Sequence, residues 1–196
     1  MIDVTFVSTN RGKFREVRDV LRPYGIRVRW ERRSLPEPQV DRLEDVAASK
    51  LDAVREVPGT VLVEDSGLFI PSLHGFPGVY SAHFLRVWKF GPIFELLRHR
   101  RRDAHFRAVV GLRTGMQRRL FTGQVDGRIA RRAAGRGGFG YDPIFVPRGW
   151  SRTFAEGTAD EKNAISHRAR ALRRVGEYLR THPPRRGRTP VRRRRA

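Results

Sequence analysis

At the centre of the sequence lies Val61-Leu62-Val63-Glu64-Asp65-Ser66-Gly67-Leu68, in which three apolar residues precede two adjacent carboxylates, a hydroxyl and a glycine. A short apolar run rich in β-branched residues is typical of a buried strand in a sheet covered on both faces. Ligands of open α/β sheets bind beyond the carboxyl ends of such strands. We therefore expect a strand that ends at Glu64 and Asp65 and places both carboxylates at the rim of a crevice.

The paired carboxylates allow two interpretations. Two neighbouring carboxylates in one cleft repel each other, and a hard cation such as Mg²⁺ relieves that repulsion. Alternatively, the segment is a solvated turn after an edge strand, because Asp-Ser-Gly is ordinary turn chemistry. The stretch alone leaves both interpretations open.

Length and composition narrow the class of protein. A chain of 196 residues is long enough for one domain with a substantial core. The absence of cysteine excludes disulfides, thiolate metal sites and cysteine nucleophiles, and is compatible with a reducing cytoplasm. The segment Met1–Val4 enters a strand-like run at once, and no apolar run approaches the ~20 residues needed to span a bilayer. We expect a cytoplasmic protein without a membrane partner.

The charge is strongly basic, with a formal net value of +21. Such a charge attracts polyanions, including nucleic acid, anionic lipid and phosphorylated small molecules. Much of it is local, in the cluster Arg98–Arg102 and in the run 185–195, a like-charge block typical of disorder. We expect a single α/β domain over residues 1–182 and a disordered arginine-rich tail over 183–196, which is a candidate for non-specific nucleic-acid contact.

The first candidate site follows the first predicted strand, Val4–Val7. The turn Ser8-Thr9-Asn10-Arg11-Gly12-Lys13 leads into a predicted helix from Phe14 to Leu21. Strand, polar turn and helix together present backbone N–H groups and a helix dipole to an anion, and Lys13 adds a cation. The glycine spacing is not that of a Walker loop. A plain helix cap is the alternative, because Ser, Thr and Asn are all good caps.

The middle of the chain predicts the remaining framework. A second strand is expected over Ile26–Trp30, followed by a loop with two prolines at 35–39 and an amphipathic helix over 43–57. After the central strand come a turn-rich segment at 74–81 and a short helix at 90–97. Alternating segments at 105–112 and 118–125, joined at Thr114-Gly115, predict a hairpin and hence an antiparallel portion in a mixed sheet.

Two later segments carry candidate ligand-binding groups. Phe139 and Tyr141 lie among glycines at 135–143, where they could stack on a nucleobase, although a flexible loop anchored by aromatics is equally compatible. Ser166 is a candidate N-cap of a helix. His167 and Arg168 would then lie in its first turn, where the helix dipole disfavours their charge and an anionic or carbonyl-rich ligand would offset the mismatch. The alternative is a basic surface turn.

Five motifs occur in this order along the chain: Ser8-Thr9-Asn10-x-x-Lys13, Glu64-Asp65-Ser66-Gly67-Leu68, Gly75-Phe76-Pro77-Gly78-Val79-Tyr80-Ser81, Gly138-Phe139-Gly140-Tyr141-Asp142-Pro143 and Glu161-Lys162-Asn163-x-x-Ser166-His167-Arg168. Together they resemble the inosine triphosphate pyrophosphatase family, also called the Ham1-like or non-standard purine nucleoside triphosphatase family. The resemblance covers residues 4 to 180 and excludes the basic tail. Five motifs in register are far more specific than any one of them.

The resemblance implies a fold, an activity and a partner. The fold would be a mixed, twisted α/β sheet with flanking helices, forming two lobes around a deep central cleft, usually as a homodimer. The activity would be Mg²⁺-dependent hydrolysis of ITP, dITP and XTP to the monophosphate and pyrophosphate.

The resemblance also implies residue roles. Ser8, Thr9, Asn10, Arg11, Gly12 and Lys13 would hold the triphosphate, and Phe139, Gly140, Tyr141 and Asp142 the base. Asp65 would be the catalytic carboxylate, either as metal ligand or as the base that activates water, with Glu64 and Glu37 assisting at the metal. Ser66 would contact substrate, Lys162 phosphate or sugar, and His167 and Arg168 the purine edge.

The sequence departs from the family pattern in the loop before the second helix. That loop usually carries a carboxylate near a Gln-Gly or Thr-Gly step, whereas here it reads Glu37-Pro38-Gln39-Val40, so Asp41 and Glu44 compete with Glu37 as metal ligands. Lys50 matches a family lysine only if the loop length is judged correctly. His83 stands where relatives often have arginine.

Two alternative functions remain open at this point. A related pyrophosphatase with another base preference would share the chemistry but not the substrate. A nucleic-acid-binding protein that acts through its basic tail would show salt-dependent binding, although the sequence contains no recognition-helix or RNP-type motif.

Overall fold

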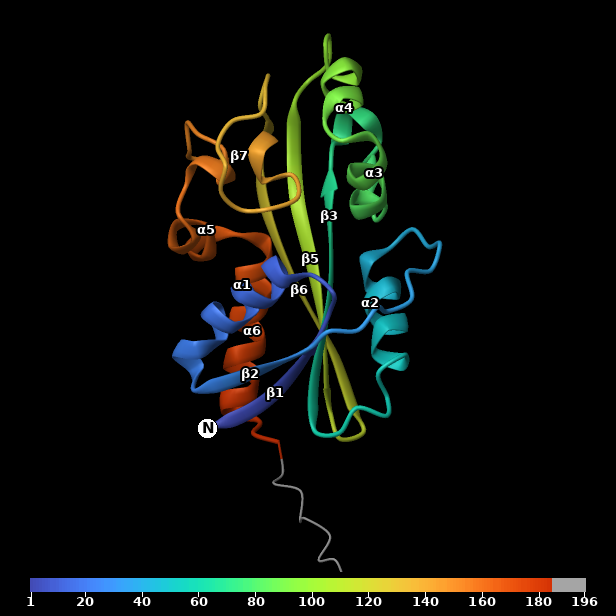
Figure 1. Ribbon diagram of the computed structural model, residues 1–196, viewed down its shortest axis with the longest axis vertical. Helices are drawn as coiled ribbons and strands as arrows, with labels where there is room; N and C mark the ends of the chain where they lie inside the picture. Colours follow the sequence, from blue (N-terminus) through green and yellow to red (C-terminus); the bar gives the residue numbers. More distant parts are fainter. Residues whose placement is uncertain (185–196) are drawn as a thin grey trace, which may run out of the picture.

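A seven-stranded mixed sheet runs the length of the elongated molecule in the computed structural model, which describes residues 1–184 (Figure 1). Its strands are β1 (Ile2–Val7), β2 (Ile26–Glu31), β3 (Thr60–Phe69), β4 (Pro77–Gly78), β5 (Asp103–Thr114), β6 (Gln117–Ile129) and β7 (Phe145–Pro147). The order is β2-β1-β3-β5-β6-β7, with β4 paired to β3. β1 runs parallel to β2 and β3, and the other pairs are antiparallel, which confirms the predicted mixed sheet and hairpin.

Six α-helices flank the described sheet: α1 (Arg11–Leu21), α2 (Leu43–Asp52), α3 (Ser81–Trp88), α4 (Gly91–Leu96), α5 (Ala159–Ile165) and α6 (His167–Thr181). In Figure 1, α1, α5 and α6 lie to the left of the long central strands, and α2, α3 and α4 lie to the right. Short 3₁₀ turns at Arg22–Tyr24, Pro71–Leu73, Asp142–Ile144 and Phe154–Glu156 complete the framework.

The alternation of β3 separates two cores. Leu62 packs with α1 and α6 in one buried cluster, while Val61 and Val63 pack with Leu51 of α2 in another. Successive side chains of a strand point to opposite faces, so a continuous apolar run is required only where helices cover both faces. The three apolar residues at 61–63 meet that requirement and are fully buried. This strand is therefore the centre of the fold, as the sequence indicated.

A third buried cluster fills the upper half of the molecule. It joins Leu68 and Ile70 to the α4 residue Ile93 and to Tyr141 and Phe145 from the glycine-rich segment and β7. The upper lobe thus has its own core, and the lower lobe is built around β1, α1 and α6. The long strands β3, β5 and β6 extend through both lobes (Figure 1).

Two boundary predictions were wrong. The central strand does not end at the carboxylates but continues to Phe69, because β3 pairs with β5 over its whole length and that ladder holds the polar residues extended. The helix predicted over 43–57 ends at Asp52. The chain then turns, and the Arg113 guanidinium donates hydrogen bonds to the carbonyl oxygens of Val54 and Val57 instead of leaving them to a further helical turn.

Four further elements were not predicted: α3, α5, β4 and β7, which have between two and eight residues each. The predicted helix over 90–97 is present as α4, and Ser166 caps α6 by accepting a hydrogen bond from the Ala169 N–H at 3.2 Å, as predicted.

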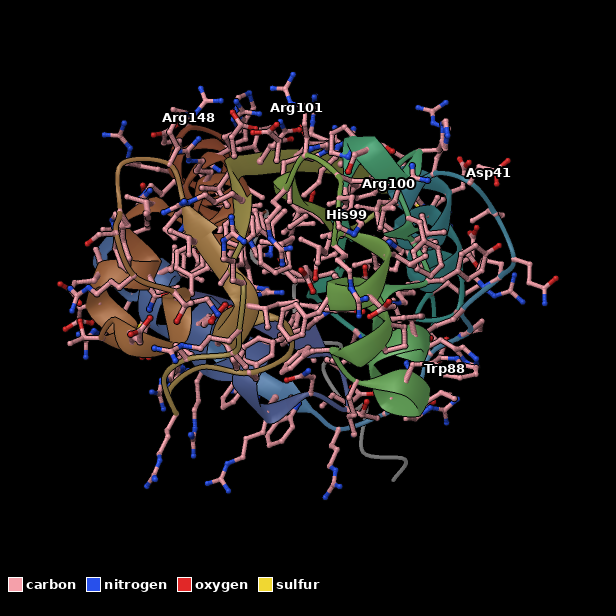
Figure 2. All side chains as sticks on the ribbon, turned by 90° about the horizontal axis from the view of Figure 1, so that it is seen from above. Asp41, Trp88, His99, Arg100, Arg101 and Arg148 are labelled. Atoms are coloured by element: carbon pink, nitrogen blue, oxygen red, sulfur yellow. The ribbon has the colours of Figure 1, made fainter. Side chains whose placement is uncertain are left out.

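The arginine-rich connection between α4 and β5 is exposed from Arg98 to Arg101, whereas Arg102 is half-buried and donates hydrogen bonds to backbone carbonyl oxygens, among them that of Ile129 at 2.9 Å. Figure 2, which looks down on the upper end of the molecule, shows Arg100, Arg101 and Arg148 at this end together with His99. Within residues 1–184, none of the helices has the length and apolar character needed to cross a membrane. α6 ends at Thr181, next to the predicted domain boundary at 182, while the predicted tail lies outside the described residues from position 185 onward.

Candidate active site

The candidate site opens where β1 stops and β3 continues. β1 pairs with β3 only from Val4↔Thr60 to Phe6↔Leu62, and β1 ends at Val7. From Glu64 onward, β3 therefore extends beyond the carboxyl end of its parallel neighbour, where a crevice is expected in a sheet of this kind. The carboxylates reach this crevice from inside the strand rather than from its end.

Glu64 faces the side of the sheet that α1 and α6 cover. Its carboxylate lies 2.7 Å from the Lys13 ammonium and 3.1 Å from the Arg168 guanidinium, and its side chain is fully buried. Burial alone would raise the pKa of Glu64, but the charges of Arg168 and Lys13 hold it well below its usual range. Glu64 is thus an ionised carboxylate that fixes two cations.

Asp65 faces the opposite side of the sheet, toward α2. Its carboxylate lies 2.5 Å from the Lys50 ammonium, which is 3.6 Å from the carboxylate of Glu37. Burial raises the pKa of Asp65 above its usual range, against the opposing charges of Lys13 and Lys50. From the sequence, the position of Lys50 depended on an uncertain loop length. In the structure, Lys50 lies in the candidate site.

A third group of buried charges joins the glycine-rich segment to α5. The Lys162 ammonium lies 2.5 Å from the Asp142 carboxylate and 2.8 Å from Glu16. Glu16 in turn lies 2.5 Å from the Arg168 guanidinium, while Asp142 also accepts a hydrogen bond from the Phe139 N–H at 2.7 Å. These contacts link residues from three distant parts of the sequence into one network.

Asn10 caps α1, Ser8 supports this cap, and both residues line the site. The Asn10 side chain accepts a hydrogen bond from the Lys13 N–H at 3.0 Å, and the Ser8 hydroxyl accepts one from the Asn10 N–H at 3.1 Å. The helix-cap interpretation is confirmed for Asn10. It does not compete with anion binding, because a capped helix N-terminus still presents a positive dipole end to the cavity in front of it.

Two neighbouring cavities meet at this point. The cationic cavity has a volume of about 460 Å³, and its polar lining comprises Ser8, Thr9, Asn10, Lys13, Arg33, Ser34, Glu37, Lys50, Glu64, His83 and Arg86. The aromatic cavity has a volume of about 350 Å³, and the candidate residues that line it are Ser66, Phe139, Gly140, Tyr141, Asp142, Lys162, His167 and Arg168. Asn10, Lys13, Ala82 and Arg86 line both cavities.

A smaller cavity of about 240 Å³ adjoins them and contains the remaining carboxylate of the pair. Asp65, Glu37, Lys13, Ser66 and His83 are among its lining residues. Asp65 is therefore next to the cationic cavity and faces the same space as Glu37. Within residues 1–184, no three His, Asp or Glu side chains gather into a ready-made metal site.

The aromatic cavity is built from stacked rings and buried cations. The Phe139 ring centre is 4.5 Å from the Lys162 ammonium nitrogen and 5.4 Å from the Arg168 guanidinium carbon. His167 stacks on Phe106 with ring centres 4.6 Å apart. A Cβ atom at Gly12 would lie 2.6 Å from the Phe139 ring, so only glycine allows this ring to close against α1.

His167 supplies an unpaired buried polar atom. It is 3% exposed, and its Nδ1 has no hydrogen-bond partner among the described residues. Burial, aided by the charges of Arg168 and Lys162, holds the pKa of His167 well below its usual value. A neutral imidazole at the start of α6 removes the dipole mismatch that its position implied, and Glu16 and Glu64 neutralise Arg168 beside it.

Two candidate residues have different surroundings from those expected. Tyr141 donates its hydroxyl hydrogen bond to the Ser81 carbonyl at 2.8 Å and is 4% exposed, so it also joins the cavity wall to α3. Arg11 is exposed at the start of α1 and lines none of these three cavities.

The three carboxylates that competed as metal ligands in the loop before α2 and at its start differ in location. Asp41 is exposed, and Glu44 is paired with Arg107. Glu37 is therefore the candidate of the three that lines the cationic cavity.

Sequence reasoning missed several residues that line or support the site. Glu16 carries a detectable signal, because it lies one helical turn after Lys13 and therefore on the same face of α1. Arg33 and Arg86 have no comparable signal, since exposed arginines are frequent throughout the chain. Only the folded arrangement shows that they face the cationic cavity.

Comparisons with known proteins identify the family of this chain. The sequence model of the Ham1 family matches residues 4–178. A relative from Thermococcus kodakarensis named dITP/XTP pyrophosphatase is 47% identical over 179 residues, which cover 90% of this chain and 96% of the relative. One from Methanopyrus kandleri with the same name is 44% identical over 182 residues, covering 91% and 97% of the two chains.

Solved structures show the same architecture. A HAM1 protein from Coxiella burnetii superimposes with a TM-score of 0.78 at 30% identity, covering 91% of this chain and 98% of that one. The match confirms the predicted mixed sheet with flanking helices. Because the family match and the relatives extend over nearly the whole described chain, this protein belongs to the Ham1 family.

Proposed function

We propose that the protein hydrolyses the non-standard purine nucleoside triphosphates ITP, dITP and XTP to the monophosphate and pyrophosphate. The observation that carries this proposal is the junction of the aromatic and cationic cavities. One cavity offers a stacking ring and buried polar groups to a base, and the other offers a helix N-terminus and cations to a chain of phosphates. The names of the relatives from Thermococcus kodakarensis and Methanopyrus kandleri support the same substrate class.

The phosphates would occupy the cationic cavity. Ser8, Thr9, Asn10 and Lys13 line it, and Arg11 and Gly12 complete the turn that starts α1. Backbone N–H groups at this helix start and the Lys13 ammonium would hold the triphosphate oxygens. Lys13 pairs with Glu64 and lines both cavities, so its ammonium would lie near the phosphates where the nucleotide passes from one cavity to the other.

Asp65 is the proposed catalytic carboxylate. It is buried beside Lys50 and opens into the cavity that it shares with Glu37. In this position it would act as a metal ligand or as the base that orients the attacking water, with the Ser66 side chain directed toward the substrate on the opposite face. Attack on the α-phosphorus requires a positioned water and donors for the departing pyrophosphate.

The donor set fits a magnesium ion, which we propose as the cofactor. Mg²⁺ is usually bound by one or two carboxylates together with substrate phosphates and water, so a complete protein cage is not needed. Glu37 and Asp65 face one cavity, and Glu64 lines the adjoining one, so these carboxylates would hold it. When bound, the ion neutralises charge on the phosphate oxygens and makes water a better nucleophile.

The base would be held by Phe139, Gly140, Tyr141 and Asp142 and read by His167 and Arg168. Hypoxanthine and xanthine carry a carbonyl at C6, where adenine carries an amino donor. Among the described residues that line the aromatic cavity, His167 supplies the one buried side-chain atom without a hydrogen-bond partner, Nδ1, which in its protonated tautomer would donate to the C6 carbonyl oxygen of a matching base. A site of buried polar groups rejects a mismatched base strongly, because the mismatch leaves them unpaired. Exclusion of guanine requires a conflict at its 2-amino group.

We also propose that the enzyme is a cytoplasmic homodimer. Apolar side chains that are exposed on and beside α3 and α4 support self-association, among them Trp88 at 60%, Val87 at 53% and Leu96 at 47% exposure. Figure 2 shows Trp88 on the outer side of the molecule. Sedimentation equilibrium of the purified full chain tests this, and a monomer at micromolar concentration would contradict it.

The test of the proposed activity is a substrate panel. Pyrophosphate release would be measured for ITP, XTP, dITP, ATP, GTP and dTTP, with Mg²⁺ and with EDTA. We expect metal-dependent release from ITP, XTP and dITP and little from the others. Release from a different nucleotide would retain the reaction and overturn the base assignment. Inactivity of a folded protein toward the whole panel would overturn the proposal and favour nucleic-acid binding.

A further inference from the structure

α3 forms the wall of the site that faces the start of α1. Ala82 and His83 from its first turn, and Leu85, Arg86 and Lys89 further on, line one or more of the three cavities. None of these side chains is among the residues to which the family resemblance assigned a role. The surface of α3 that faces the site is therefore still without a function.

The cations that line the cationic cavity differ in their partners. Lys13, Lys50 and Arg33 each form an ion pair with a carboxylate, at 2.7, 2.5 and 2.5 Å respectively. Arg86 is the exception, since no carboxylate of residues 1–184 lies within 4.0 Å of it. Its positive charge is the one in this lining that the described protein does not neutralise.

Arg86 is nevertheless held in place by one contact. Its Nη2 lies 3.2 Å from Nδ1 of His83, one turn earlier on α3. A guanidinium only donates hydrogen bonds, so the His83 nitrogen must accept. This single contact leaves most of the five N–H donors of Arg86 available to another acceptor.

The location of Arg86 defines what that acceptor would be. Arg86 lines both the cationic and the aromatic cavity, together with Asn10, Lys13 and Ala82. A nucleotide with its base in the aromatic cavity would pass these four residues as its phosphates enter the cationic one. Guanidinium groups bind phosphate oxygens in pairs through parallel N–H donors, which gives both strength and orientation.

We propose that Arg86 is a substrate-binding residue that holds the triphosphate from the α3 side, opposite Lys13 and the N-terminus of α1. This inference rests on the proposed function and adds a phosphate contact to it. Because Arg86 contacts phosphate and not the base, its contribution is the same for every base the enzyme accepts. It also ties the upper lobe to the lower lobe through the substrate.

The test compares Arg86→Ala with the wild-type full chain. Loss of a charge-assisted contact should lower kcat/KM by roughly ten- to a hundredfold. The loss should be equal for ITP, XTP and dITP, and Arg86→Lys should recover part of it as a point charge. Calorimetric binding of inorganic tripolyphosphate, which carries no base, should weaken by a similar factor.

Two matched variants control for the loss of an exposed side chain and for the change in net charge. His99→Ala alters an exposed residue just beyond α4, and Arg131→Ala removes an exposed arginine, and both residues lie outside the three cavities. Both should retain wild-type kinetics. Unchanged kcat/KM and tripolyphosphate affinity in Arg86→Ala would overturn the inference, as would a loss that depends on the base. In either case an active wild type would leave the proposed function intact, whereas an inactive wild type would overturn that first.

Discussion

The two halves of the candidate site handle charge in opposite ways. In the aromatic cavity, Asp142, Lys162 and Arg168 are only 2–3% exposed and are paired with one another or with Glu16 and Glu64. In the cationic cavity, the Glu37 side chain is 65% exposed and Arg86 has no carboxylate partner among the described residues. The charges of the aromatic cavity are therefore paired without a ligand, whereas the cationic cavity retains a positive charge that a ligand could neutralise.

This difference matches what each end of a nucleotide demands. A base differs from its competitors by one or two hydrogen-bonding groups, so its pocket must be fixed for a mismatch to be costly. The triphosphate is the same in every nucleoside triphosphate, so it needs no discrimination, and attraction of opposite charge suffices to bind it. The contrast predicts that substitutions in the aromatic cavity affect folding, and that those toward the cationic cavity affect turnover.

The largest effect should come from Asp65→Asn. The substitution removes the proposed catalytic carboxylate, so kcat for ITP should fall by about a thousandfold or more. Asparagine keeps the shape of the side chain, and the Lys50 ammonium keeps the Glu37 carboxylate at 3.6 Å as a partner, so the protein should remain folded although its thermal unfolding midpoint falls. Asp126→Asn, an exposed change on β6, provides the control. Retained turnover would remove Asp65 from the catalytic role.

A smaller effect, on folding itself, is expected for Arg168→Met. The substitution leaves two buried carboxylates, Glu64 and Glu16, with one cation fewer, and breaking a buried pair in this way costs about 3–5 kcal/mol. Denaturant unfolding measures the loss. Arg180→Met, exposed near the end of the same helix, should change stability by less than about 0.5 kcal/mol. Equal stability of the two variants would show that the buried ion pairs of the aromatic cavity do not stabilise the fold.

The smallest effect concerns pH. The pKa of His167 is lowered in the folded protein, so below its unfolded value of about 6.5 the unfolded chain binds a proton that the folded chain does not. The stabilisation is complete above that pH and is lost as pH falls, by up to about 1.4 kcal/mol per pH unit. His167→Gln should flatten this slope between pH 6.5 and 5, and His99→Gln, at an exposed site, should not. Parallel curves for wild type and His167→Gln would show that the imidazole is not held neutral.

The sequence predicts the framework well where local signals are strong. The apolar run at 61–63, the alternating hairpin and the Ser166 cap each depend on a pattern of neighbouring residues, and all three are present. The end of the central strand was misjudged because its polar residues are held extended by pairing with β5, which lies about forty residues away in the chain. Short-range patterns contain no information about such a ladder.

The residues of the candidate site likewise differ in how far the sequence predicts them. Lys13 and Asp142 lie within recognisable motifs, and both line the aromatic cavity. Arg86 gives no sequence signal, because exposed arginines are common throughout this chain. Glu16 and Lys50 give weak signals, one as a residue one helical turn after Lys13 and the other as a match to a family lysine. Only contacts with distant segments, such as the 2.8 Å pair between Glu16 and Lys162, place these two residues in the site.

The adjacency of Glu64 and Asp65 on opposite faces of β3 has a geometric consequence. Glu64 pairs with Lys13 and Arg168, which line the proposed base cavity, and Asp65, the proposed catalytic carboxylate, pairs with Lys50, so one peptide unit sets the spacing between these two groups. A strand advances about 3.3 Å per residue and alternates its faces strictly. A single inserted residue upstream would exchange the two carboxylates and turn every later side chain of the strand over. Insertions and deletions in β3 between its pairing with β1 and the cleft therefore cannot change the site by small steps, because even one residue reverses the face to which each later side chain points.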